Sequence, residues 1–97
     1  MNIELREIVE LKAEEFKKKE YSQLQQIVEK KGEYFQVEYK NKKYNIEIDA
    51  EYFKGNNIRV RVQGEKNTLF GNLSGFARYF AKSSNGDFIE QNDEIIF

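Results

Sequence analysis

The chain has 97 residues, of which 39% are hydrophobic and 34% are charged, and this is enough apolar side chain for one hydrophobic core. It contains neither Cys nor His, which excludes disulfides, metal sites built on thiolate or imidazole, and Ser-His-Asp or Cys-His catalysis. A formal net charge of −1 provides no general attraction to nucleic acid or to an anionic membrane. We therefore expect a single small domain, residues 1–97, without a cofactor.

The N-terminal segment has the pattern of an amphipathic helix that begins after Asn2, a typical capping residue, and runs to Lys18 or Lys19. One stripe of this helix is mainly apolar and consists of Leu5, Ile8, Val9, Lys12, Ala13 and Phe16. Glu and Lys residues fill the opposite side, which is typical of a helix surface in contact with solvent.

A second helix is predicted to begin near Ser22, because Ser22 and Gln25 have the spacing of a capping box. Gly32 adopts the left-handed conformation easily and would end this helix. The apolar positions of the helix are Leu24, Ile27 and Val28. One bent helix over residues 3–31 is the alternative.

Three short runs between Tyr34 and Val62 alternate apolar and polar residues with a period of two. The apolar members of these runs are Phe35, Val37, Tyr39, Tyr44, Ile46, Ile48, Ala50, Ile58, Val60 and Val62. Such alternation predicts an antiparallel sheet with one buried face and one face in water. Because a small domain needs two packed layers, we expect an α+β fold with the helix or helices on one face of three to four strands.

The first connection of this sheet is predicted to be a two-residue turn at Asn41 and Lys42. It would pair Tyr39 with Tyr44 and continue into two further pairs in which both residues are apolar. Asn41 tolerates the positive φ angle that such a turn requires.

The second connection is predicted to centre on Lys54. This register places Glu47 opposite Arg61 and Asp49 opposite Arg59 on the wet face. We expect ion pairs there, each contributing roughly 0.2 to 1 kcal/mol.

The remainder of the chain is predicted to contain a turn at residues 64–67 and a fourth strand, at an edge, over residues 68–71. Residues 73–82 fit a short helix, with Ser74 as its cap and apolar residues at helical spacing, although alternation at 76–80 also fits a strand. We predict the helix. Asn85 and Gly86 predict a further turn, so the C-terminal segment is expected to be short and helical or a hairpin.

Carboxylates are the only catalytic groups that the sequence offers, and Glu47 with Asp49 is the one preplaced pair near basic residues. Catalysis or metal binding needs carboxylates that converge in a cleft, which a small open sheet does not supply. The glycines lack the spacing of a nucleotide loop, and the turn at 85–87 lacks the remaining ligands of a calcium loop. We expect neither an enzyme nor a metal or nucleotide site.

The charged N-terminal residues differ from a signal peptide, and the sequence has no apolar stretch long enough to span a bilayer. We therefore expect a cytoplasmic protein that does not bind membranes.

Two functions are compatible with these features. The first is a protein-binding module, for example an immunity protein or inhibitor that caps a toxin or enzyme. Acidic residues near the C-terminus, together with neighbouring rings, would steer and anchor a cationic protein partner. The predicted partner-binding residues are Tyr79, Phe88, Glu90, Asp93 and Glu94.

The alternative is a sheet that binds single-stranded nucleic acid, in which Arg59 and Arg61 contact phosphates and Tyr34 stacks on a base. Against this function, the predicted ion pairs with Glu47 and Asp49 would neutralise both arginines. Nucleic acid is therefore the less favoured partner.

Overall fold

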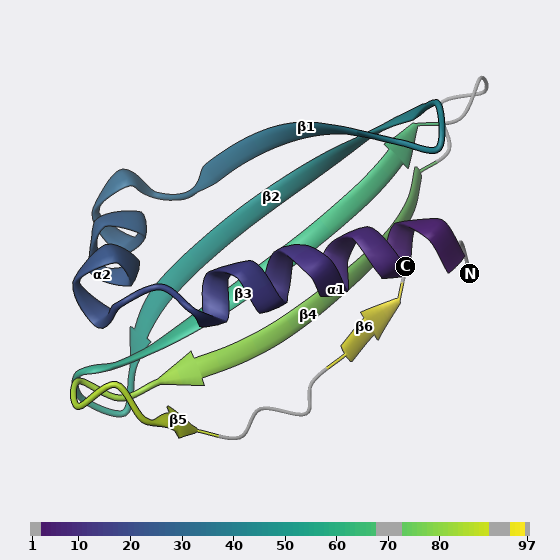
Figure 1. Cartoon of the computed structure of the whole chain (residues 1–97). Helices are drawn as coiled ribbons and strands as arrows, with labels where there is room; N and C mark the ends of the chain where they lie inside the picture. Colours follow the sequence, from purple (N-terminus) through teal and green to yellow (C-terminus); the bar gives the residue numbers. More distant parts are fainter. Residues whose placement is uncertain (1–2, 68–72, 90–93, 97) are drawn as a thin grey trace.

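The computed structural model describes residues 3–67, 73–89 and 94–96, and in this part of the chain two helices pack on one antiparallel sheet (Figure 1). The helices are α1 (Ile3–Lys17) and α2 (Tyr21–Lys30). The strands are β1 (Glu33–Tyr39), β2 (Lys42–Phe53), β3 (Asn57–Asn67), β4 (Leu73–Lys82), β5 (Phe88–Ile89) and β6 (Glu94–Ile96). The predicted α+β class is confirmed, with two helices rather than one bent helix.

The sheet follows the chain order, since β1, β2, β3 and β4 each pair antiparallel with the next strand. β5 and β6 both pair with β4, and they lie end to end along the edge that β3 leaves open (Figure 1). The described sheet therefore has five strand positions, compared with the three to four that the sequence predicted.

Residues 73–82 form strand β4, so the short helix predicted for this segment is wrong. The four-residue spacing of Phe76 and Phe80 suits a helix, but it also equals two strand periods and puts both rings on one face of a sheet. The segment forms a strand rather than a helix because β3 is long enough to pair with β4 along the whole length of β4.

The predicted turn at 64–67 is also wrong, because these residues continue β3. The fourth strand that was expected at 68–71 lies outside the described residues. Gly64 has a different role: a Cβ atom there would lie 2.6 Å from Val9 Cγ2 and 2.8 Å from Leu5 Cδ1. The glycine lets α1 approach the sheet closely.

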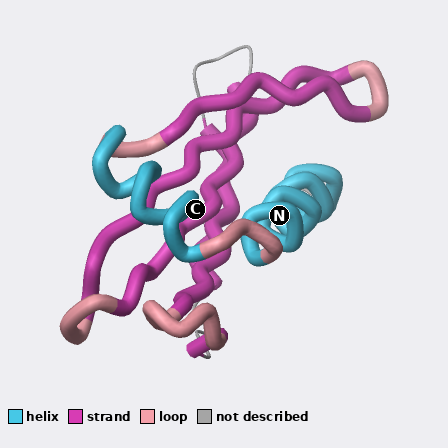
Figure 2. Tube along the Cα trace, turned by 60° about the vertical axis from the view of Figure 1, so that its left-hand side comes forward, coloured by secondary structure: helices cyan, strands magenta, loops and turns pink. Residues whose placement is uncertain are grey.

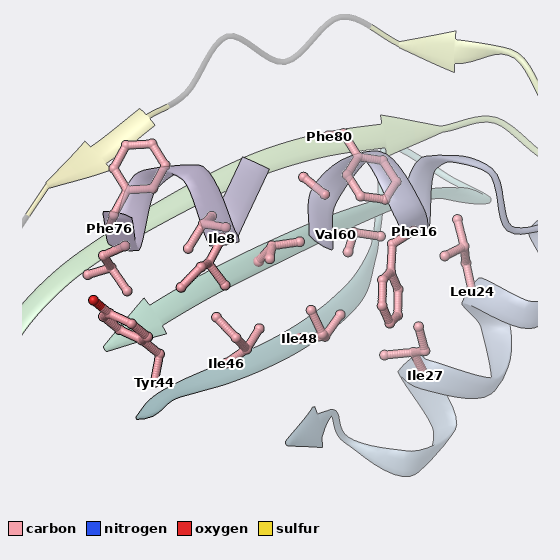
Figure 3. Packing of buried hydrophobic residues seen from close by; sticks show 14 of the residues in the cluster. Ile8, Phe16, Leu24, Ile27, Tyr44, Ile46, Ile48, Val60, Phe76 and Phe80 are labelled. Atoms are coloured by element: carbon pink, nitrogen blue, oxygen red, sulfur yellow. The ribbon is translucent and has the colours of Figure 1, made fainter. Parts of the chain in front are cut away.

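The face of the sheet under the helices, which we call the helix face, carries the hydrophobic core (Figure 3). Phe16 extends from α1 toward Ile48 of the sheet and Ile27 of α2 in this view, so one ring joins three elements. The strand residues of the core are Tyr44, Ile46, Ile48, Ile58, Val60, Val62, Phe76 and Phe80. Their burial confirms the face assigned to the alternating runs.

The β1–β2 turn lies at Lys40 and Asn41, one residue earlier than predicted, and both residues have the positive φ of a type I′ turn. Tyr39 consequently pairs with Lys42, and every predicted partner moves by two residues along β2. A register shift of two residues keeps each side chain on its face, so the residues predicted for the core are still on the buried side. The hairpin projects over the same side of the sheet as α1 (Figure 2), where the Tyr39 hydroxyl donates to Glu7 Oε2 at 2.7 Å.

The ends of the two helices are closed by different groups. Lys82 is buried on β4, and its Nζ donates to the carbonyl oxygens of Lys17 at 3.2 Å and Lys19 at 2.7 Å, at the C-terminus of α1. The capping box of α2 uses Glu20 and Gln23, two residues before the predicted pair. Neither helix is long and apolar enough to cross a membrane.

Candidate functional site

The opposite face of the sheet, which we call the open face, is covered by no helix in the described part of the chain. The strand register gives its members, because residues of one parity on each strand point to the same side. The larger described side chains of the open face are Tyr34, Gln36, Glu38, Lys43, Asn45, Glu47, Asp49, Glu51, Phe53, Asn57, Arg59, Arg61, Gln63, Glu65, Tyr79 and Ile89.

Ion pairs connect β2 and β3 across the open face, as the sequence predicted, but the partners differ in part. Arg61 contacts Asp49 directly and lies 3.5 Å from Glu47, so the predicted Glu47–Arg61 pair is present. Arg59 pairs with Glu51 instead of Asp49, with Nε 3.1 Å from Oε1. The reason is that the connection centres one residue later than expected, on Gly55, which moves each partner by two residues.

Electrostatics around Arg61 are unbalanced. Partial burial and repulsion from Asp49 raise the pKa of Glu47, and the attraction of Arg61 offsets only part of this effect. For Arg61, burial is the largest single influence and lowers the pKa, but the charge and hydrogen bond of Asp49, together with Glu47 and Tyr79, raise it by more in total, so the guanidinium stays charged. The Arg61 guanidinium therefore lies near two carboxylates, those of Asp49 and Glu47, and it compensates the negative charge of Glu47 only in part.

The aromatic side chains of the open face differ in solvent exposure and in the contacts that they already make. Tyr34, opposite Glu47 on the neighbouring strand, is 74% exposed. Tyr79, opposite Arg61, is half-buried and already contacts a cation, because the Arg59 guanidinium carbon lies 6.0 Å from its ring centroid and 5.6 Å from that of Phe53. Tyr34 is thus the ring of this face that a partner could cover.

Described residues of the open face line two shallow hollows. The first has a volume of about 400 Å³, and the polar residues that line it are Tyr34, Gln36, Asn45, Glu47, Gln63 and Glu65. The second, of about 330 Å³, surrounds the ion pairs of Arg59 and Arg61 next to Tyr79. The charged side chains among the described residues that line the first hollow are Glu47 and Glu65, and Glu65 accepts a hydrogen bond of 2.7 Å from Gln63 Nε2.

Of the predicted protein-binding residues that the structure describes, Tyr79 and Phe88 lie on different faces of the sheet. Tyr79 belongs to the open face, whereas Phe88 is opposite Lys82 on the other side, with its ring centroid 5.1 Å from Lys82 Nζ. Glu94 is opposite Arg78 in the pairing of β6 with β4, so this part of the acidic segment has a basic neighbour across the ladder. Glu90 and Asp93 lie outside the described residues.

The residues of the alternative site lie on one face, although Tyr34 and the two arginines line different hollows. Tyr34, Arg59 and Arg61 come from β1 and β3 and share the open face with the carboxylates that neutralise the arginines. The alternation also assigned Gln63 to this face, but sequence reasoning missed Glu65, because the supposed turn at Gly64 hid the end of β3. The continued alternation of polar residues at 59, 61, 63 and 65 was the signal that could have found it.

Among the residues that the structure describes, no three carboxylates are placed to hold a metal ion. No protein-family model, curated protein or solved structure matches the chain. Function is therefore inferred from the geometry and charge of the surface.

Proposed function

We propose that this protein is a small, non-enzymatic, cytoplasmic protein-binding module, comparable to an immunity protein or inhibitor, and that its open face receives a basic surface of a partner protein. The observation that carries the proposal is an uncovered sheet face with a surplus of negative charge around an exposed ring. Among the described residues of this face, five carboxylates, from Glu38, Glu47, Asp49, Glu51 and Glu65, stand against three basic side chains, from Lys43, Arg59 and Arg61.

The surplus charge favours a cationic partner. Each of the three basic residues has an acidic neighbour, since Lys43 is opposite Glu38 and the two arginines are paired. A basic protein surface would be steered by the remaining carboxylates, and burial of Tyr34 would then contribute to affinity.

A protein partner fits this surface better than a small substrate does. Asp49, one of the two carboxylates that could act together in catalysis, is already held by Arg61. The hollows are shallow, and the chain has no His or Cys that could act as a general base or nucleophile at neutral pH. Binding through the C-terminal residues Glu90, Asp93 and Glu94 stays a prediction.

Single-stranded nucleic acid is the second candidate, because Tyr34, Arg59 and Arg61 share one face. The excess of carboxylates on that face opposes it, since phosphate binding depends on uncompensated cations. A titration with single-stranded oligonucleotides at low salt distinguishes the two functions. Binding that weakens steeply with salt would favour nucleic acid, and no binding at low salt would remove it.

The test of the protein-binding function begins with a partner identified by pull-down and continues with association kinetics. The double substitution Glu47→Gln and Glu65→Gln removes charge beside Tyr34, whereas Glu14→Gln with Glu29→Gln removes the same charge from exposed positions on the helices. We expect the first variant to associate several-fold more slowly, with a smaller salt dependence, and the control to behave like the parent. Equal rates and equal salt dependence for both variants would contradict the proposal.

A further inference from the structure

The two edges of the sheet differ. The outer edge of β4 is paired by β5 and β6, whereas in the described part of the chain nothing pairs with the outer edge of β1. Proteins usually protect an edge with proline, a bulge, charged side chains, especially lysine, or a very short strand. β1 has seven residues without Pro or Lys, its charged residues are Glu33 and Glu38, and its one-to-one register with β2 has no bulge. The edge is therefore long, regular and open.

The β1–β2 turn fixes which backbone groups this edge presents. In a two-residue hairpin the residues that flank the turn, here Tyr39 and Lys42, exchange both backbone hydrogen bonds. Every second residue of β1, counted back from Tyr39, then forms backbone hydrogen bonds with β2 as well. The N–H and C=O groups of the residues between them, Tyr34, Gln36 and Glu38, point away from the sheet and form a template for another strand.

We propose that an extended segment of the protein partner adds to β1 as a further strand, with basic residues on its open-face side. The proposal rests on the protein-binding function and specifies how the partner docks. Side chains of an added strand alternate between faces. On the open face they would lie beside Tyr34, Gln36 and Glu38, and on the helix face beside the half-buried Phe35 and Val37. A segment that alternates basic and apolar residues fits both sides.

Charge favours this partner over a second copy of the chain. Pairing of β1 with β1 of another copy would join two open faces that each carry five carboxylates and three basic side chains. Glu38 lies on β1 itself, and Glu47 and Glu65 line the hollow next to it, so self-pairing brings like charges together. A basic segment would neutralise the same groups.

The backbone requirement is tested with an acetylated peptide of alternating Lys and Val, as long as β1, added to the isotope-labelled protein. We expect the amide signals of Tyr34, Gln36 and Glu38 to shift, with no shift from a peptide of alternating Glu and Val. Gln36→Pro removes one outward N–H without touching the β1–β2 ladder, whereas Gln36→Thr keeps it. The proline variant should bind about tenfold more weakly or worse, and the threonine variant like the parent.

A second arm leaves the protein unaltered. A Lys-Val peptide N-methylated at alternate residues cannot donate hydrogen bonds from one edge, so binding should be lost when that edge faces β1. Absence of shifts in β1 would overturn the strand addition. Shifts confined to Glu47 and Glu65, equal in Gln36→Pro, would overturn it too, yet would leave docking on the open face intact. Self-association that disappears in Gln36→Pro would show a second copy as the occupant and overturn the choice of partner.

Discussion

Side chains of the helix face and of the open face alternate along the same strands, but the two faces are stabilised by different interactions. Ile48 on the helix face has 0% exposed surface, whereas its neighbour Asp49 on the open face keeps 34% of its side chain exposed while it pairs with Arg61. The stabilisation from buried apolar surface is large and does not change when the strand register shifts by two residues. The stabilisation from exposed ion pairs is small, is screened by salt and depends on the register. One face therefore holds the fold together, and the other is available for binding.

The largest effect is expected from truncation on the helix face. Ile48→Ala removes a fully buried side chain near Phe16 and Ile27 (Figure 3) and leaves a cavity, so the free energy of unfolding should fall by about 2 to 5 kcal/mol. The matched control is Asn45→Ala on the open face of the same strand, which should change stability by less than about 0.5 kcal/mol. Urea unfolding of both variants measures the difference, and equal stabilities would mean that the faces are assigned incorrectly.

The next effect comes from addition of a single carbon to the helix face. Gly64→Ala would push a methyl group against Val9 and Leu5, and overpacking of this kind costs about 1 to 3 kcal/mol. Because the clash is specific, Val9→Ala should offset part of the loss, and the two substitutions should be non-additive by about 0.5 kcal/mol or more in a double-mutant cycle. Additive losses would show that α1 does not lie against this glycine.

The helix face was predictable because a period of two survives a shift of two residues. The sequence assigned Ile46, Ile48 and Val60 to the correct side although the β1–β2 turn lies one residue earlier. Gly64 was misinterpreted because glycine marks both turns and positions of close approach, and only the packed helix distinguishes them. Residues 73–82 were misassigned because their apolar spacing satisfies two periods, and the pairing with β3 that decides the outcome is not a local property.

The open face was predictable only in part. Tyr34, Arg59 and Arg61 were expected to share a surface because they alternate with the apolar residues of their strands, and a register shift of two residues leaves each side chain on its face. The ion-pair partners depend on the length of the β2–β3 connection, so Glu51 was missed. Tyr79 and Phe88 are separated by a turn, and their sequence spacing could not reveal that they lie on opposite faces.

A smaller effect is expected when an ion pair of the open face is reversed. Arg59→Glu or Glu51→Arg alone places like charges across the two strands and should cost roughly 0.2 to 1 kcal/mol. The double reversal restores an attractive pair and should recover most of this loss, because both side chains extend into solvent. Thermal unfolding at low and high salt checks this, and the differences should shrink with salt. Severe unfolding of the double variant would indicate a buried network rather than a surface pair.

The smallest effect concerns Glu47. A carboxylate in an ion pair usually has a lowered pKa, whereas the pKa of Glu47 is raised. Burial and repulsion from Asp49 raise the pKa of Glu47 above its unfolded value of about 4.3, so ionisation is harder in the folded protein. The unfolded chain loses this proton first as the pH rises, so the folded state loses stability progressively between the unfolded and the folded pKa and keeps the full penalty above both. Below that range the carboxyl is protonated in both states, and the penalty is absent.

Glu47→Gln cannot ionise and avoids this penalty. We expect the stability of the variant relative to the parent to increase between about pH 3 and pH 7, by less than about 1 kcal/mol because the side chain is partly in water. Urea unfolding at several pH values measures the trend, and Glu29→Gln on the exposed surface of α2 controls for the loss of one negative charge. If the variant instead became relatively less stable as the pH rises, the attraction to Arg61 at 3.5 Å would outweigh burial and repulsion. In that case Glu47 would be a compensated charge, and the surplus that is proposed to attract a basic partner would have to come from Glu65.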